Sequence, residues 1–598
     1  MDELSLKYEL TRIRSLVFAL LLVALMGCSA ETVPSNDVTS ADVSEADVIL
    51  TNARVYTLSW EEPSLEGEIS SDAPLDERGW RPDAEAVVIQ DGIIRFVGST
   101  SDAMKLSGDS TRVIDLDGAT VIPGLVDSHT HIFGLGALLD KVNLIDVPDA
   151  ATAVDLVRRR AQSTPKGEWI IGRGWDEGAW ANDYPDKREL SAAVPDHPVL
   201  LRGRHGFAVW VNEKALELAG VTASSVVPVG GEMQLGEDGS PSGLFMNRAV
   251  TMFDSVLPVP TRATLRRHAR LGLEQMAKDG YTAIHDAGLD SMQMFTLEAM
   301  EAEGELPIRV YAMLSLRDEP LIRRWLKKGP DSDADSMLVT RTVKAYYDGA
   351  LGSRGARLLA DYSDMAGHRG VSGGNYGFDE ALNAEAMRAG FQIAIHAIGD
   401  AGNREAIDIL EAVFRDYPET IANRHRIEHA QVLADSDIPR LQQYDMIASM
   451  EPPHAMEDKA WAEERLGSTR ILGAYAWRTL REAGARLTFN SDNPGSDHSI
   501  FYGLHSAITR QDANLLPEGG WYPEQRMTVD EAIRAYTSWS AHASFRESQT
   551  GYIEVGQWAD ITAMDVDPFV LAGNSPEKIL AGQIVLTMVD GDVVYELN

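Results

Sequence analysis

Cysteine is almost absent from this chain: of its 598 residues, only Cys28 carries a thiol. A single cysteine cannot form an intrachain disulfide, and zinc sites built on cysteine are excluded from the body of the chain. The sequence is therefore neither a disulfide framework nor a cysteine-based zinc fold.

Positive charge is also scarce. The chain has 54 lysines and arginines against 91 aspartates and glutamates, which gives a formal net charge of −37. So negative a surface disfavours nucleic acid and anionic membranes as partners. The apolar fraction of 44% is ordinary for a folded protein. The length suffices for one large domain and a smaller one.

The apolar run at residues 16–26 is too short to span a bilayer. It follows three basic residues and ends at Leu25-Met26-Gly27-Cys28, which resembles the lipobox of bacterial lipoproteins. This resemblance implies a signal peptide at 1–28, a lipid on Cys28 and a polar, flexible tether at 29–45. We then expect the protein in the bacterial cell envelope, lipid-anchored on the periplasmic side of the outer membrane. The alternative is an ordinary cleaved signal that leads to export without a lipid.

Both ends of the remaining chain are rich in predicted strands. Residues 47–58 alternate apolar and polar side chains, and residues 86–97 form a predicted hairpin that turns at Asp91-Gly92. Residues 551–564 and 584–595 show the same pattern of short predicted strands, and the second segment turns at Asp590-Gly591. We predict that 46–120 and 545–598 are two halves of one β-sandwich, although two unrelated β-appendages would show the same pattern.

The middle of the chain alternates strands with helical stretches. Eight alternating units predict an α/β fold, a (β/α)₈ TIM barrel over 121–544 with an insertion at 133–261. A doubly wound open sheet is the alternative, but no G-x-G-x-x-G follows the first strand. The predicted strands are the one that ends at His131, then 281–285, 308–314, 342–347, 391–396, 426–429, 446–450 and 486–490.

Polar residues end several of these strands, and catalysis in such barrels takes place at the carboxyl ends of the strands. His129 and His131 are spaced i, i+2, which on a strand places both imidazoles on one face. Each candidate alone has a structural explanation, such as a core histidine or a salt-bridged lysine. Together they predict a metal site. The later candidates, each on or just after a predicted strand, are Lys344, His396, His429 and Asp492.

This arrangement resembles the metal-dependent amidohydrolase superfamily, and within it amidohydrolase family 3, which includes N-substituted formamide deformylases and YtcJ-type proteins. The resemblance covers about Val48 to the C-terminus. The motifs that carry it are PGLVDSHTH at 123–131, GRGWDEGAW at 172–180, VNEKAL at 211–216, VKAYYDGALGSRGA at 343–356, HAIGD at 396–400, RIEHAQ at 426–431 and SDNP at 491–494.

The resemblance implies a centre of two divalent metal ions, with zinc preferred and manganese, cobalt or iron not excluded. His129 and His131 would bind the first ion, and His396 and His429 the second. Lys344 would be carboxylated and bridge the two ions, because an ammonium cannot ligate a cation whereas a carbamate can.

In this scheme Asp492 would bind the first ion and act as general acid and base. The implied reaction is hydrolysis of a linear, non-peptide amide, such as an N-acyl or N-formyl amine, by a metal-activated hydroxide. The expected partner is thus a small-molecule amide. Any membrane contact would run through the lipid on Cys28, and an oligomer is left open.

Substrate contacts are expected from four further residues. His205 and Trp175 lie in the insertion, His454 follows the seventh strand, and Arg354 follows the fourth. A packing role is the alternative for each. Other activities also fit these ligands: a cyclic-amide hydrolase or deaminase, a phosphotriesterase or lactonase, or a non-catalytic surface-binding lipoprotein.

Overall fold

The computed structural model describes residues 45–597 apart from 146, 176–184, 204–207, 229–230, 334, 353 and 372. Its largest sheet has eight parallel strands, which follow one another in chain order. These strands are β9 (Leu125–Thr130), β16 (Tyr281–Leu289), β17 (Arg309–Ser315), β18 (Leu338–Tyr346), β19 (Gln392–Ala397), β20 (Arg426–His429), β21 (Ile447–Met450) and β22 (Arg486–Phe489).

The sheet curves round until its first and last strands meet. β9 and β22 contact each other, and Thr130 forms a parallel bridge to Asn493 just beyond β22. Apolar residues of these strands and of the helices around them share one buried core. The (β/α)₈ barrel is thereby confirmed. Its helices are α7 (Arg262–Lys278), α8 (Ser291–Ala302), α9 (Glu319–Lys328), α11 (Glu380–Arg388), α12 (Asp400–Asp416), α13 (Ile438–Gln443), α14 (Pro452–Asp458), α15 (Ala462–Arg470), α16 (Trp477–Glu482), α17 (Ile500–Thr509), α18 (Val529–Ala535) and α19 (Ser538–Ala543).

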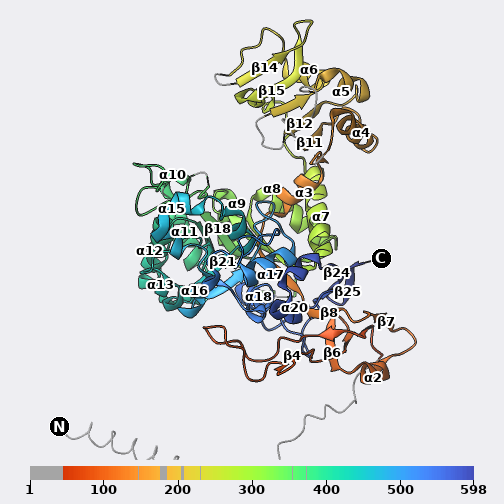
Figure 1. Ribbon diagram of the computed structural model, residues 1–598, viewed down its shortest axis with the longest axis vertical. Helices are drawn as coiled ribbons and strands as arrows, with labels where there is room; N and C mark the ends of the chain where they lie inside the picture. The colour runs from red at the N-terminus through yellow and green to blue at the C-terminus, as the bar shows by residue number, and fades with distance from the viewer. Residues whose placement is uncertain are drawn as a thin grey trace, which may run out of the picture. The chain divides into compact units, whose positions relative to one another are not determined.

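The two chain ends share a sheet. β8 (Thr120–Pro123) pairs antiparallel with β23 (Ile561–Met564). Figure 1 shows the early strand β8 beside the late strands β24 (Ile584–Val589) and β25 (Asp592–Glu596). Leu50 and Val87 of a second sheet are buried with Val121 and Ile561 in one apolar cluster. The composite β-sandwich is therefore confirmed. Its sheets contain β2 (Arg54–Val55), β8, β23, β24 (Ile584–Val589) and β25 (Asp592–Glu596), and β1 (Val48–Thr51), β5 (Ala86–Gln90), β6 (Ile93–Gly98) and β7 (Arg112–Asp115).

Asp-Gly pairs make the turns in this domain. Asp91 and Gly92 have φ of 53° and 70°, and Asp590 and Gly591 have φ of 55° and 81°. Positive φ at both central residues is the requirement of the tight hairpin turn whose twist matches that of the strands. Pro123 ends β8 and β9 begins at Leu125, so the sandwich leads directly to the first barrel strand.

The insertion has its own sheet and apolar clusters. Its helices are α4 (Ala150–Ala161), α5 (Lys187–Ala193) and α6 (Glu213–Ala219). Its strands are β10 (Val142–Asn143), β11 (Ile170–Trp175), β12 (Val199–Gly203), β13 (Ala208–Val211), β14 (Gly231–Leu235) and β15 (Pro241–Asn247). Across the residues that the structure describes, no helix is long and apolar enough to cross a membrane.

The helix after the first strand, α3 (Ile132–Leu139), packs against α7 at very short range. A Cβ added to Gly136 would lie 1.8 Å from the carbonyl oxygen of His268, so only glycine permits this approach. Directly after α3, Asp140 accepts hydrogen bonds from Arg160 of α4 and from Arg267 of α7. One carboxylate therefore links the insertion, α3 and the barrel.

The stability that this link contributes should depend on pH. Burial alone would raise the pKa of Asp140, but its hydrogen bonds to His268, Arg267 and Arg160 hold the pKa well below its usual value. A carboxylate with a depressed pKa stabilises the fold above about pH 4, and this contribution is lost as the pH falls through the folded-state pKa. We expect Asp140→Asn to cost about 1–2 kcal/mol at pH 7 because the site is partly solvated. The midpoints of thermal unfolding of the two proteins should converge below about pH 4.

Asp155→Asn is the matched control, because Asp155 pairs with Arg158 on the exposed face of α4. It should leave the midpoint nearly unchanged at every pH. A constant difference between Asp140→Asn and wild type from pH 7 down to pH 3 would contradict the electrostatic explanation.

Candidate metal centre

The candidate residues come together at the carboxyl ends of the barrel strands. Lys344 lies on β18 in register with Ala394 of β19, and His429 ends β20 in register with Ala397. His396 precedes Ala397 on β19. The parallel register brings side chains that are far apart in the sequence to one rim, as a barrel of this type requires.

Asp492 joins the first histidine pair. Its Oδ1 lies 3.1 Å from His131 Nε2 and 3.6 Å from His129 Nε2. His129 is completely buried, whereas the side chain of His131 is 37% exposed, so this part of the site opens toward solvent on the His131 side. One ligand atom each from His129, His131 and Asp492 lies within 4.8 Å of the others, a spacing that suits one metal ion.

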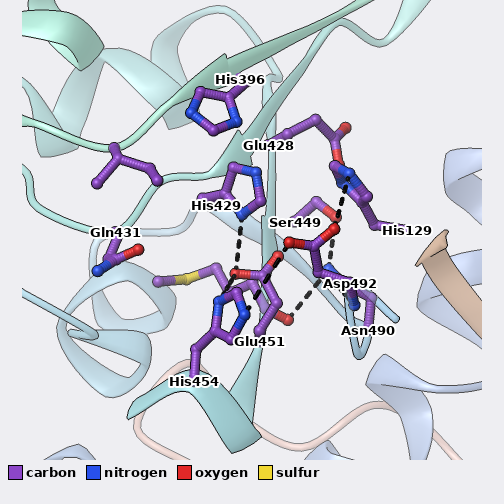
Figure 2. A network of polar contacts seen from close by, with 12 residues as sticks. His129, His396, Glu428, His429, Gln431, Ser449, Glu451, His454, Asn490 and Asp492 are labelled. Carbon is purple, nitrogen blue, oxygen red and sulfur yellow. Dashed lines mark hydrogen bonds and ion pairs between the residues drawn. The ribbon is translucent and has the colours of Figure 1, made fainter. Parts of the chain in front are cut away.

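A second group lies on the other side of Asp492. The rings of His396 and His429 are 4.4 Å apart, and Asp492 Oδ2 lies 4.0 Å from His454 Nε2. Figure 2 shows Asp492 between His129 and His454, with Glu451 contacting both His429 and His454. His429, His454 and Asp492 also offer ligand atoms within 4.8 Å of one another. Asp492 is thus shared by two potential cation positions.

The backbone at these ligands is unusual. Asp492 has φ of 49° and His429 has φ of 72°, in the left-handed region that non-glycine residues seldom adopt. The Asp492 N–H donates to the carbonyl of His129 at 3.0 Å and to Asn490 Oδ1 at 3.1 Å. Such strain costs about 1–3 kcal/mol and persists where surrounding contacts fix it, which is typical of functional sites.

Lys344 occupies the centre of the site. It is only 1% exposed, and its Nζ lies 2.8 Å from His129 Nε2. Burial lowers the pKa of Lys344 to about 8, although the carboxylates of Glu428 and Asp492 oppose the shift. Among the described residues Lys344 has no carboxylate within 4 Å, so its buried amine contacts a histidine nitrogen instead of forming a salt bridge.

His129 is oriented from behind by a buried ionic network. Its Nδ1 lies 2.5 Å from Glu428 Oε2, and Glu428 Oε1 lies 2.8 Å from Arg426 Nε. Arg426 also contacts His285 Nδ1 at 2.9 Å and donates to the Ser128 carbonyl at 2.7 Å. With Nδ1 held by a carboxylate, Nε2 of His129 is directed to Asp492 and Lys344 and is free to ligate.

The side chains present fit a divalent metal centre. Apart from the amine of Lys344, the donors are imidazole nitrogens and carboxylate oxygens, the ligands of zinc, manganese, cobalt and iron. His396 Nε2 is buried without a hydrogen-bond partner among the described residues, and it faces Asp348 Oδ1 only at 3.7 Å. Burial and the neighbouring His429 hold the pKa of His396 well below its usual value, so it is a neutral imidazole, the form that binds metals.

The other residues expected at the site have different placements. His454 lies near Asp492, as described above. Arg354 pairs with Asp364 at 2.6 Å, and Trp175 is buried in the apolar core of the insertion, where its indole N–H donates to the Leu201 carbonyl. His205 and Cys28 lie outside the described residues.

Two buried carboxylates at the site, Glu428 and Glu451, were given no role from the sequence, whereas Asp286 was expected to end the second strand. Glu428 shares a strand face with Arg426 at i, i+2, a spacing that would have indicated a buried ion pair inside the barrel. Glu451 directly follows β21, as His131 directly follows β9. Asp286 on β16 accepts from the Ile132 N–H, and its burial raises its pKa to about 7.

Comparison with known proteins agrees with this geometry. The model of the amidohydrolase family matches residues 112–595. The amidohydrolase YtcJ of Bacillus subtilis is 30% identical over 526 residues, which cover 86% of this chain and 96% of that protein. The chain belongs to the amidohydrolase family.

Two further similarities support the assignment. The N-substituted formamide deformylase of Arthrobacter pascens is 26% identical over 86% of this chain and 95% of that protein. A crystal structure of an uncharacterized metal-dependent hydrolase from Pyrococcus horikoshii superposes with a TM-score of 0.65 at 25% identity, covering 88% of this chain and 99% of that one. The protein is a metal-dependent hydrolase of carbon–nitrogen bonds, and the predicted family and enzyme class are confirmed.

The Glu428 network predicts a measurable effect on metal binding. Glu428→Gln removes the negative charge that orients His129, so we expect affinity for the divalent metal to fall about 10–100-fold. Metal content after dialysis against a graded chelator measures this. Glu428→Asp should recover part of the affinity, which separates orientation from misfolding, and Glu411→Gln on the outer helix α12 is the control. Unchanged metal retention in a folded Glu428→Gln protein would contradict the orienting role.

Proposed function

We propose that the enzyme hydrolyses a linear, non-peptide amide, such as an N-formyl or N-acyl amine, to a carboxylate and an amine. The observation that carries the proposal is the carboxylate of Asp492, held between His129 and His131 on one side and His454 on the other. A carboxylate in that position can serve as both metal ligand and proton carrier. Similarity to a formamide deformylase supports a linear amide over other carbon–nitrogen bonds.

We further propose how two divalent ions, preferably zinc, are held. His129, His131 and Asp492 would hold the first, and His396 and His429 would hold the second. Lys344 is proposed to carry a carboxyl group on Nζ and to bridge the ions. Its burial and its contact with His129 support this, because a positive ammonium would repel the cations whereas a carbamate supplies two anionic oxygens. His454 lies near enough to Asp492 to be an alternative ligand of the second ion.

The bound cations would lower the pKa of water and polarise the amide carbonyl. Asp492 takes the proton of the attacking water and returns it to the leaving nitrogen, which would otherwise depart as a poor anion. Burial would raise the pKa of Asp492, but the hydrogen bond to His131 and the nearby imidazoles hold it well below its usual value, so the carboxylate begins as a base.

His454 is proposed to donate a hydrogen bond to the oxyanion that forms on the substrate. Its Nδ1 lies 3.4 Å from Glu451 Oε2, which leaves Nε2 directed toward Asp492 and the open side of the site. A preorganised donor at this position stabilises charge that develops only in the transition state.

Removing the general base should separate catalysis from metal binding. We expect Asp492→Asn to lower kcat about 10²–10⁴-fold while the protein keeps most of its metal, because an amide oxygen can still ligate but cannot take a proton. Chelation should abolish hydrolysis, and added metal should restore it. The measurement is a hydrolysis screen of N-formyl, N-acetyl and longer N-acyl amines, together with cyclic amides, by metal-reconstituted protein.

Asp497→Asn, in the same loop but on its exposed side, is the matched control and should keep full activity. A chelated enzyme that stays fully active would contradict the metal mechanism. Turnover of cyclic amides alone would replace the linear-amide proposal by that of a cyclic-amide hydrolase or a deaminase.

Attachment to the cell envelope through a lipid on Cys28 is a separate proposal, and it rests on the Leu25–Cys28 sequence. We expect the wild-type protein in the membrane fraction of an expressing bacterium and Cys28→Ser outside it. Fractionation with detection of the protein measures this. A wild-type protein that fractionates like Cys28→Ser would contradict the anchor and favour an ordinary exported protein.

A further inference from the structure

An arginine lies at the rim of the barrel beside the metal centre. β17 ends at Ser315, which is in register with Lys344 on β18, and the N–H of Leu316 donates to the Lys344 carbonyl at 2.8 Å. Arg317 is the next residue. It therefore leaves the barrel just above the level of Lys344, on the face where the ligands gather.

The guanidinium of Arg317 is held by aromatic rings rather than by an acid. Its Cζ lies 4.1 Å from the ring centre of Tyr346 and 5.1 Å from that of Tyr376, and Nη2 donates to the Tyr376 carbonyl at 3.1 Å. Within the described part of the chain, no carboxylate lies within 4 Å of it. A guanidinium has five N–H donors, so stacking leaves its edge available for a planar anion.

Other arginines near this rim are neutralised. Arg354 is bound by Asp364 in two hydrogen bonds, and Arg357 faces Glu405 at 3.5 Å. In a chain with a net charge of −37, an exposed arginine without an acidic partner at the mouth of the site stands out. Such a cation provides local attraction for an anion that the rest of the surface repels.

Tyr346 connects Arg317 to the metal centre. Lys344 Nζ lies 5.3 Å from the centre of the Tyr346 ring, and the ring of His396 lies 6.2 Å from it. Gly288 permits this placement, because a Cβ there would lie 2.0 Å from the Tyr346 hydroxyl. The same phenol ring therefore contacts the surroundings of the proposed bridging ligand and the guanidinium.

We propose that Arg317 binds a carboxylate of the substrate, so that the preferred substrates are amides that carry a carboxylate close to the scissile bond, such as N-acyl amino acids. This inference rests on the proposed amide hydrolysis. Lys344 Nζ lies 5.3 Å and Arg317 Cζ 4.1 Å from the centre of the same Tyr346 ring. One residue spans about 3.6 Å, and a charge-assisted N···O contact adds about 2.8 Å. A carboxylate one residue away from an amide held beside Lys344 therefore falls within the range of separations that the shared ring allows.

A purely structural role for Arg317, as a clamp between Tyr346 and Tyr376, makes a different prediction. Loss of a clamp would disturb the rim for every substrate alike. Loss of a carboxylate anchor would affect only substrates that have the carboxylate. The test therefore uses two amides that differ in this group alone: N-acetyl-leucine and its decarboxylated counterpart, N-acetyl-3-methylbutylamine, each also as the N-formyl compound.

In metal-reconstituted wild-type enzyme, we expect kcat/KM for the carboxylated amides to exceed that for their neutral counterparts. Arg317→Gln should lower kcat/KM for the carboxylated amides about 10–100-fold, mainly through KM, and change the neutral ones less than about threefold. Arg317→Lys should recover part of the loss, because it keeps the charge but not the planar fork. Arg323→Gln on α9, which removes an exposed arginine paired with Glu319, should leave both unchanged.

Calorimetric titration of chelated protein with N-acetyl-leucine gives a readout that does not require turnover. Binding should weaken on Arg317→Gln and not on Arg323→Gln. Equal losses for carboxylated and neutral amides, or unaltered binding of N-acetyl-leucine, would overturn the anchor and leave amide hydrolysis intact. Arginine-dependent binding of N-acetyl-leucine without turnover of any amide would instead refute the proposed reaction and keep Arg317 as an anion site.

Discussion

The position of one carboxylate governs the site. Asp492 is held within reach of His129 and His131 on one side and of His454 on the other. Its φ of 49° lies in the left-handed region, which is unfavourable for an aspartate. Contacts from the opposite end of the barrel sheet keep it there: its N–H binds the His129 carbonyl, and the N–H of His131 binds the Asn493 carbonyl at 2.9 Å. The hydrogen bonds that close the barrel thus also fix the distance between the histidine pair and its carboxylate.

Buried charged groups lie beneath this rim of the barrel. Glu428 and Arg426 are both fully buried, and each would be strongly destabilising alone. Paired with each other and with His129 and His285, they give His129 a fixed orientation. Farther out, the ring of Tyr346 lies between the surroundings of Lys344 and Arg317. The guanidinium of Arg317 stacks on aromatic rings and is not paired with an acid among the described residues. The inner groups orient His129, a candidate metal ligand, and the outer ones provide the proposed contact with the substrate.

Much of the fold was predictable because its signals are local. Asp-Gly turns mark the hairpins of the sandwich, and the alternation of strands with helices marks the barrel. The candidate ligands were visible for the same reason, since a histidine or aspartate that ends a barrel strand lies at the rim whatever the loops do. The matched motifs gave the family, which the comparisons confirm.

Contacts made by loop residues could not be predicted in this way. Arg354 is a predicted substrate contact, and in the structure it pairs with Asp364. Both residues lie in the loop that follows β18, and a loop has no regular spacing that would show which side chains meet. The position of Arg317 is equally hidden, because nothing in the sequence indicates that Tyr346 and Tyr376 surround it. Pairing across loops depends on tertiary packing, whereas strand ends depend on register alone.

Anomalous X-ray diffraction from crystals of zinc-loaded enzyme tests the proposed two-metal centre most directly. Two peaks about 3.5–4 Å apart are expected. One should lie beside His129, His131 and Asp492 and the other beside His396 and His429, with density from Lys344 Nζ reaching both. A single peak, or peaks away from Asp492, would contradict this proposal.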